Sequence, residues 1–160
     1  MDEVLIDNIN NTVGENDTLY HLGDFAFGPR DDRAYIKKVA EYRYKIKCKN
    51  IHLIWGNHDR RYMRHDYERL FTSIRDLDEI RVNNQKIVLC HYAMLVWNGS
   101  HRGVWHLYGH SHGTLPDNPE TKAFDAGVDC HNYFPLSFEE VKAIMDKKTY
   151  VPVDRHGTEH

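Results

Sequence analysis

Four short apolar runs constrain what this chain can fold into, because each one ends abruptly in residues that can bind a metal ion. The runs and the residues that follow them read TLYHL then GD, IHLIW then GNHD, KIVLC then HY, and VWHLY then GHSH. Short apolar runs that are rich in β-branched and aromatic residues and bounded by turn residues predict strands. Because segments with helical periodicity alternate with these runs, the sequence predicts a single α/β domain.

The remaining elements are predicted from periodicity, caps and turn residues. Helices are expected in four segments: the opening MDEVLIDNINNTV, Asp31 to about Lys47, Tyr67 to Ile74, and the residues after the capping box of Ser137 and Glu140. The stretch EIRVNNQKIVLCHY predicts a hairpin that turns at its two asparagines, which tolerate positive φ, and FDAGVD predicts a last strand.

Composition excludes several classes of protein. The 160 residues fit one domain, and 21 basic against 24 acidic residues, a net charge of −3, give no general attraction to nucleic acid or to a membrane. No apolar run approaches the roughly 20 residues of a membrane span, and the N-terminus lacks a signal-peptide pattern. Three scattered cysteines suit a reducing compartment. We therefore predict a cytoplasmic protein with one domain over residues 1–150 and a tail over 151–160.

The polar residues after the four runs predict a metal centre. Open α/β sheets build their sites where the carboxyl ends of strands converge. A carboxylate, an amide oxygen and imidazoles suit Zn, Mn or Fe rather than Ca. The twelve histidines of the chain could instead be solvated surface residues, but the same order of features in four places favours ligation. The predicted ligands are Asp24, Asn57, His91, His110 and His112.

Three further residues are candidates for substrate contact. Tyr92 and Trp105 lie in or beside the loops of the histidine ligands, where they could stack on a flat group or simply pack at the rim. Arg60 follows GNHD, and its guanidinium could grip a phosphate oxygen or remain an ordinary surface cation.

The motifs GD at 23–24, GNHD at 56–59, His91 and GHSH at 109–112, in that order, resemble those of the calcineurin-like metallophosphoesterases. The resemblance extends from about Thr18 to Asp129. It implies an α/β fold in which a two-sheet β-sandwich is flanked by helices, with the metal centre at the strand ends. It also implies hydrolysis of phosphate mono- or diesters by in-line attack of a metal-bound hydroxide.

The same resemblance assigns roles to individual residues. It implies that Asp24 bridges two metal ions and that Asn57, His91 and His110 complete the shell of one of them, while His112 belongs to the other. His58 is implied to face the substrate, where it stabilises the transition state or protonates the leaving oxygen. The expected cofactors are divalent Mn, Zn or Fe ions, and the expected partner is a small phosphoester, with a nucleotide as one candidate.

Two departures from the family pattern lead to further expectations. The D-x-H motif that normally precedes GD is missing, so we expect the fold to lack its first strand, the domain to be incomplete at its N-terminus and one metal ion to bind weakly. An exposed sheet edge would then favour a homo-oligomer. The alternative is an impaired remnant with one metal ion or none that acts as a binding module. Phe27 replaces a family aspartate that orients the substrate-facing histidine, and it is expected to pack or to line the pocket.

Overall fold

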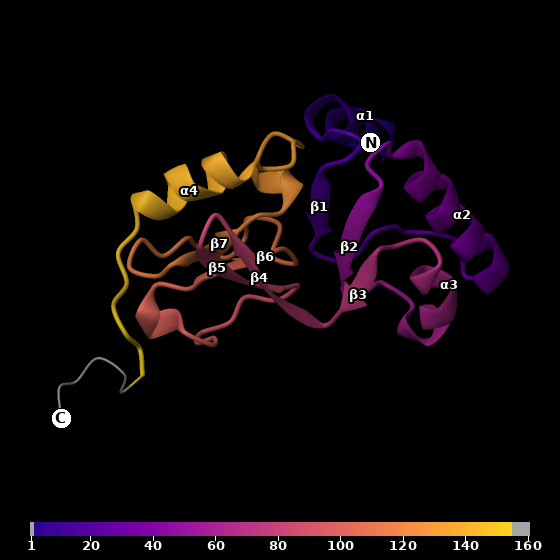
Figure 1. The fold of residues 1–160 in the computed structure, drawn as a ribbon. Coiled ribbons are helices and arrows are strands. Elements are labelled where there is room, and N and C mark those ends of the chain that lie inside the picture. The colour runs from indigo at the N-terminus through magenta and orange to yellow at the C-terminus, as the bar shows by residue number, and fades with distance from the viewer. Residues whose placement is uncertain (1, 155–160) are drawn as a thin grey trace.

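The computed structural model describes residues 2–154, which form two β-sheets flanked by helices (Figure 1). In the first sheet, β1 (Thr18–His21), β2 (Asn50–Ile54) and β3 (Ser73–Arg75) are parallel and lie in that order. In the second, β4 (Leu77–Val82), β5 (Gln85–Cys90), β6 (Trp105–Tyr108) and β7 (Ala123–Asp125) lie in chain order, and only the β4–β5 pair is antiparallel. The predicted two-sheet α/β fold is confirmed.

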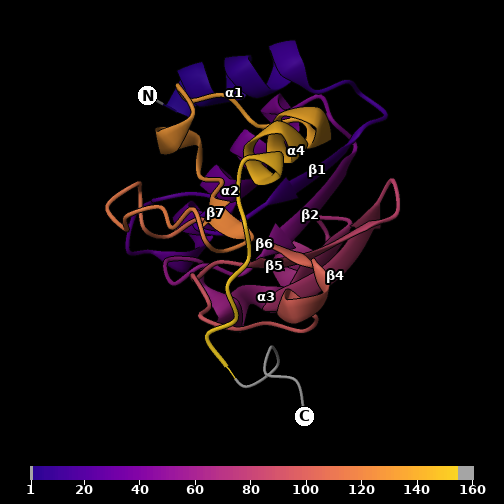
Figure 2. The same cartoon turned by 90° about the vertical axis from the view of Figure 1, so that its left-hand side faces the viewer.

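The helices cover the two sheets separately. As Figures 1 and 2 show, α1 (Asp2–Thr12), α2 (Asp32–Lys45) and α3 (Arg64–Glu68) lie beside the first sheet, whereas α4 (Phe138–Asp146) lies over the second. Two helices begin as their sequences predict. The Asp31 carboxylate accepts a hydrogen bond from the backbone N–H of Ala34, and Ser137 and Glu140 form a complete capping box.

Of the three hydrophobic cores among the described residues, the two larger ones hold this arrangement together. The first lies between the first sheet and its helices, and it includes Ile6, Tyr35, Val39, Leu53 and Tyr67. In the second, residues of β1, the loop after it and β2 meet the second sheet and α4, with Tyr20, Leu22, Ile54, Leu89, Leu107, Val141 and Met145 among its members. Because the second core joins the two sheets, it fixes the strand ends of one sheet relative to those of the other.

One predicted element is wrong in part. The helix expected over 67–74 ends at Glu68 as α3, and Ser73–Arg75 forms β3 instead. Ile74 is buried and pairs with Leu53 of β2, so the backbone of this segment completes the first sheet. Three residues are too few to show a strand period, and for this reason the helical pattern before them was extended too far.

The predicted hairpin agrees with the structure, whereas the strand predicted in FDAGVD ends at Asp125 and is followed by a 3-10 segment over Val128–Cys130. The hairpin of β4 and β5 turns at Asn83 and Asn84, whose φ angles are 46° and 67°. The start of the predicted tail is attached to the domain, since the backbone N–H of Val151 donates to the Glu120 carbonyl at 2.9 Å. The rest of that tail, from residue 155, and the start at residue 1 lie outside the described residues.

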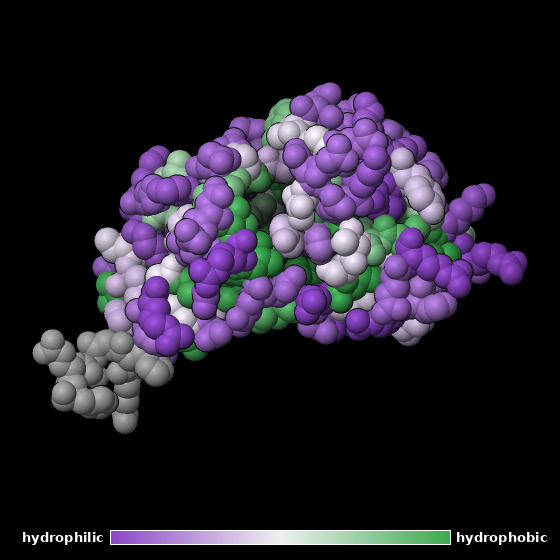
Figure 3. All heavy atoms as spheres, viewed as in Figure 1, coloured by the Kyte–Doolittle hydropathy of each residue, from purple (hydrophilic) through white to green (hydrophobic). Residues whose placement is uncertain are grey.

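The surface of the described residues is mostly polar. In the view of Figure 3, hydrophilic residues cover both halves, and hydrophobic residues are visible in a band across the lower middle. Between residues 2 and 154, no helix combines the length and the apolar character that crossing a bilayer requires.

Candidate metal centre

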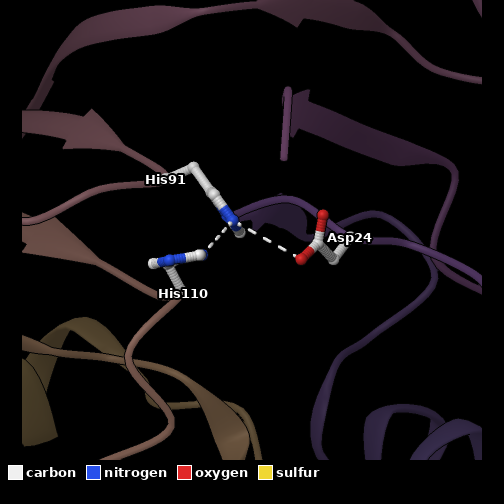
Figure 4. A group of neighbouring side chains, drawn as sticks. All are labelled: Asp24, His91 and His110. Atoms are coloured by element: carbon white, nitrogen blue, oxygen red, sulfur yellow. Dashed lines mark hydrogen bonds and ion pairs between the residues drawn. The ribbon is translucent and has the colours of Figure 1, made fainter. Parts of the chain in front are cut away.

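Four of the five predicted ligands meet at one place. Figure 4 shows Asp24 facing the rings of His91 and His110, and their ligand atoms all lie within 4.8 Å of one another. His91 Nε2 lies 3.5 Å from Asp24 Oδ2, 3.2 Å from His110 Nδ1 and 2.9 Å from Asn57 Oδ1. Asp24 and Asn57 follow β1 and β2 of the first sheet, and the two histidines follow β5 and β6 of the second, so the centre bridges the two sheets.

Hydrogen bonding to the backbone identifies one proton of the centre, on the His91 ring. His91 Nδ1 lies 2.6 Å from the Leu22 carbonyl oxygen, which can only accept, so Nδ1 is the donor and Nε2 of the neutral ring keeps its lone pair. That lone pair faces the amide oxygen of Asn57 and the carboxylate of Asp24, both of which are acceptors as well. When the His91 ring carries a single proton, at Nδ1, a nitrogen lone pair, an amide oxygen and a carboxylate converge on one point. Such a set suits a divalent cation, so the residues present fit the metal that the motifs imply.

The loops that carry these ligands have unusual backbone geometry. Asp24, His110 and His112 have left-handed φ angles of 55°, 37° and 48°. Such angles are uncommon for residues other than glycine and cluster at functional sites. The neighbouring glycines allow close approach. A Cβ at Gly56 would lie 2.1 Å from Asp24 Oδ1, and one at Gly23 would lie 2.5 Å from His91 Nδ1, so a side chain at either position would displace a ligand.

A buried carboxylate that the motif analysis did not assign holds the first two loops together. Asp59 Oδ2 accepts hydrogen bonds from the backbone N–H groups of Asp24 and Gly56, both at 2.8 Å, and Oδ1 accepts from that of Phe25 at 2.9 Å. Because three donors surround it, Asp59 fixes the GD and GNHD loops rather than contacting a ligand. Nothing in the sequence indicated this role for Asp59, because an acidic residue after a strand looks the same in a sequence whether it binds backbone N–H groups or is exposed to solvent.

The predicted catalytic histidine lies next to the centre but outside it. The backbone N–H of His58 donates to Asp24 Oδ1 at 2.7 Å, which anchors the carboxylate, while the residue itself is exposed. The His58 ring packs against that of Phe27, with 4.9 Å between the centroids, and Phe27 is 58% exposed. Phe27 therefore contacts the histidine through its ring, at the position where a carboxylate was expected from the family pattern.

His112 is the one predicted ligand that does not join the cluster. Its Nδ1 lies 2.5 Å from Asp129 Oδ2 in the loop after β7. A second hydrogen bond joins the loop after β6 to the end of β7, because Asp125 Oδ2 accepts from the backbone N–H of Gly113 at 3.0 Å. Neither aspartate was among the predicted site residues. The available signal was their position at and after the end of the last predicted strand, in FDAGVD.

The three predicted substrate contacts fall into different places. Tyr92 lies beside the centre, with its ring centroid 4.7 Å from that of His110, and it is 43% exposed. Trp105 does not line the site: it is 6% exposed in the second core, where its ring stacks on Phe138, and the predicted contact is corrected on this ground.

Arg60 is occupied elsewhere. Its guanidinium donates to the Asp32 carboxylate at 2.6 Å and to the Pro29 carbonyl, and it lies 4.0 Å above the Tyr35 ring. The prediction that Arg60 grips a phosphate is therefore also corrected, because its donors fasten the loop before α2 instead.

His21 lies on β1, three residues before Asp24. Burial lowers the pKa of its imidazole, while the nearby carboxylates of Asp59 and Asp24 oppose this shift. Its Nδ1 has no hydrogen-bond partner among the described residues, and its ring packs edge-on against Phe25.

Two sheets whose strand ends gather a carboxylate, an amide oxygen and two imidazoles define a metal-binding α/β protein. Comparison with protein-family models names the family within this class: the model of the calcineurin-like phosphoesterase family matches residues 3–136. The chain belongs to this family, which implies phosphoester hydrolysis and binding of divalent metal ions in general terms.

Individual relatives agree with this assignment at the level of the fold. The chain is 27% identical over 152 residues to the uncharacterized protein MJ1445 of Methanocaldococcus jannaschii, and the match covers 92% of this chain and 76% of that protein. It also resembles the crystal structure of the protein of unknown function AQ665 from Aquifex aeolicus, with a TM-score of 0.64 and 22% identity. That similarity covers 89% of this chain and 84% of the other, and it shows the fold alone.

Proposed function

We propose that this protein hydrolyses small phosphate mono- or diesters by in-line displacement at phosphorus, with divalent cations as cofactors. Asp24, Asn57, His91 and His110 would hold one cation, and Asp24 and His112 would hold a second. The observation that carries the proposal is the convergence of potential ligand atoms around His91 Nε2. This nitrogen lies 2.9 Å from Asn57 Oδ1 and 3.5 Å from Asp24 Oδ2.

The cations and the protein would contribute different parts of the chemistry. When bound, Mn, Zn or Fe neutralises phosphate oxygens and makes hydroxide available near neutral pH. The chain itself supplies rigid positions for the ligands. Asp59 holds the two loops of the first sheet, and the Leu22 carbonyl fixes the His91 ring. Ligands that are fixed before the substrate binds need no reorganisation during the reaction.

His58 is proposed to act on the substrate. Its backbone is tied to Asp24, while its exposed ring rests on Phe27 beside the centre. In this position the imidazole can stabilise the charge that develops on the phosphoryl oxygens, or it can give a proton to the leaving oxygen. In both roles His58 acts on the substrate and does not bind the cations, which the other residues of the centre would hold.

Tyr92 supports a substrate with a flat leaving group. Its ring is exposed next to His91 and His110, so a base or another aromatic group attached to the phosphate could stack on it. We propose a small phosphoester, with a nucleotide among the candidates, as the substrate. We also propose a cytoplasmic location, which the three free cysteines Cys48, Cys90 and Cys130 support.

The experiment that tests the proposal measures hydrolysis of p-nitrophenyl phosphate and bis(p-nitrophenyl) phosphate after chelation and after addition of Mn²⁺, Zn²⁺ or Fe²⁺. We expect turnover only with a metal ion, and a loss of about 100-fold or more in kcat/KM in Asp24→Asn and His91→Ala, since the first removes the negative charge of the carboxylate and the second removes an imidazole ligand. His65→Ala is the matched control, because His65 lies on α3 and contacts Arg69 on the surface.

Two results would contradict this function. Turnover that survives both chelation and the His91→Ala substitution would show that the catalytic centre lies elsewhere. Metal uptake without any turnover of either ester would favour a binding module over an enzyme.

A further inference from the structure

A polar contact outside the metal cluster joins the last two loops of the second sheet. His112 follows β6, and Asp129 lies in the short 3-10 segment Val128–Cys130 that follows β7. His112 Nδ1 and Asp129 Oδ2 are 2.5 Å apart although the residues are 17 positions apart in the sequence. The loops are also fixed behind this contact, because Asp125 accepts hydrogen bonds from the backbone N–H groups of Gly113 at 3.0 Å and Gly127 at 2.9 Å.

This contact determines which nitrogen of the His112 ring is free to bind a ligand. An ionised carboxylate can only accept, so His112 Nδ1 carries a proton, and in the singly protonated ring Nε2 keeps its lone pair. The side chain of His112 is 65% exposed, which leaves Nε2 open to a ligand from outside. His91 is held in the same way, with its Nδ1 donating to the Leu22 carbonyl and its Nε2 turned into the centre. The chain thus fixes the same tautomer at two of its histidines.

His112 also lies close to the centre along the chain. It follows His110 by two residues, and two extended residues span at most about 7 Å. The backbone turns tightly here, with left-handed φ angles of 37° at His110, 48° at His112 and 70° at Gly113. The backbone of His112 is therefore near that of His110, while its ring is not among the groups that converge with Asp24 and His91.

We propose that Asp129 is a positioning residue that holds His112 Nδ1, so that His112 presents Nε2 to the second cation. The inference rests on the proposed function, in which His112 serves that cation. Asp129 itself touches neither cation nor substrate. Carboxylates that orient a ligating histidine in this way raise its affinity for metal, and their removal typically weakens binding about 10- to 100-fold.

The first test needs no metal. Long-range ¹H–¹⁵N correlation spectra of the metal-free protein, recorded above the ordinary imidazole pKa of about 6.5, report which ring nitrogen is protonated. We expect the Nδ1–H tautomer at His112 in the wild type and a shift toward Nε2–H in Asp129→Ala. Asp129→Asn keeps an oxygen acceptor and should keep the wild-type tautomer. A His112 tautomer that is the same in Asp129→Ala as in the wild type overturns the proposal.

The second test is calorimetric titration of the metal-free protein with Mn²⁺. Two binding events are expected in the wild type. In Asp129→Ala the weaker event should lose about 10- to 100-fold in affinity while the tighter one is unchanged, and in His112→Ala the weaker event should disappear. Asp146→Ala is the matched control, because it removes the same charge from an exposed ion pair with Lys142 on α4. Equal weakening of both events in Asp129→Ala, or a single event in the wild type, contradicts the proposal.

The outcomes separate this inference from the proposed function. Wild-type protein that binds two ions, shows the Asp129 effect and hydrolyses no ester would contradict the enzyme and support the positioning role. Protein that hydrolyses esters with one bound ion, whatever residue stands at 129, would support the enzyme and contradict the positioning role.

Discussion

At the scale of single residues, the space around Gly56 is predicted to decide whether the centre can form. A Cβ there would lie 2.1 Å from Asp24 Oδ1 and 2.4 Å from the Asp24 backbone nitrogen. Gly56→Ala should therefore displace the carboxylate and lower both Mn²⁺ affinity and kcat/KM by about 100-fold or more. The measurements are calorimetric titration and ester hydrolysis.

Gly109→Ala provides the matched control for that substitution. Gly109 also ends a strand beside the site, but a Cβ there would make ordinary contacts with Leu22 at 3.4 Å and 3.5 Å. We expect near wild-type metal affinity in this variant. Equal losses in the two variants would show that crowding of Asp24 is not the cause.

His106 on β6 is predicted to make stability depend on pH. Burial lowers the pKa of this imidazole, which is fully buried. Its Nδ1 donates to the Val88 carbonyl at 3.0 Å, and its Nε2 accepts from the backbone N–H of Met94 at 3.1 Å, so a second ring proton would break the latter bond. Below the ordinary pKa of about 6.5 only the unfolded chain takes up this proton, so stability is full above that pH and falls as the pH drops further.

Below about pH 6.5 the free energy of unfolding should fall by about 1.4 kcal/mol per pH unit for each histidine that stays neutral in the folded protein. His21 should add to this slope, because burial lowers its pKa as well. Urea unfolding at several pH values between about 7.5 and 5.5 would measure this slope. His106→Gln keeps a donor and an acceptor without titrating, so it should reduce the slope, whereas exposed His65→Gln should not. An unchanged slope in His106→Gln would contradict the assignment.

At this scale the residues proposed as ligands could be predicted from the sequence, but the residues that hold them in place could not. Asp24, Asn57, His91 and His110 were predictable because strand ends converge, whatever the detailed packing. Asp59 and Asp129 were not, since a carboxylate that binds backbone N–H groups or an imidazole looks in a sequence like any surface acid. Trp105 was misplaced because every residue of β6 is buried, so no alternation marks which face a side chain takes.

At the scale of elements, the capping box of α4 is predicted to stabilise the second core. The Ser137 hydroxyl accepts from the Glu140 backbone N–H at 3.2 Å, and the Glu140 carboxylate accepts from the Ser137 N–H at 2.7 Å. Ser137→Ala should cost about 1 kcal/mol and lower Tm by about 2–4 °C, as measured by thermal unfolding. Ser137→Asp restores a capping oxygen and should recover most of the loss. A Tm equally reduced in Ser137→Asp would exclude the cap as the cause.

Elements were predictable where a local signal was strong. Caps at Asp31 and Ser137 and the paired asparagines of the hairpin gave α2, α4 and the β4–β5 turn correctly. β3 has no such signal, because its three residues are set in place by pairing with β2. Tertiary pairing of that kind is absent from the local sequence.

At the scale of the whole molecule, a cation in the centre would link the two sheets. Asp24 and Asn57 belong to loops of the first sheet, and His91 and His110 to loops of the second. Metal binding should therefore stabilise both sheets together, by about 2.7 kcal/mol at a free metal concentration of 100 times Kd. Two measurements test this stabilisation: thermal unfolding with and without Mn²⁺, and hydrogen exchange of the backbone amides of β2 and β5 under the same two conditions. Protection that rises in one sheet only would contradict the link.

The left-handed backbone at Asp24, His110 and His112 limits how stable this protein can become. Each of these residues adopts a conformation that costs roughly 1–2 kcal/mol and that glycine would adopt more easily. Glycine at any of the three would relieve this cost and would remove one of the proposed metal ligands. Selection for heat resistance without selection for turnover should therefore erode the centre first, and an engineer who wants both should look for stability in α4 and the hairpin instead.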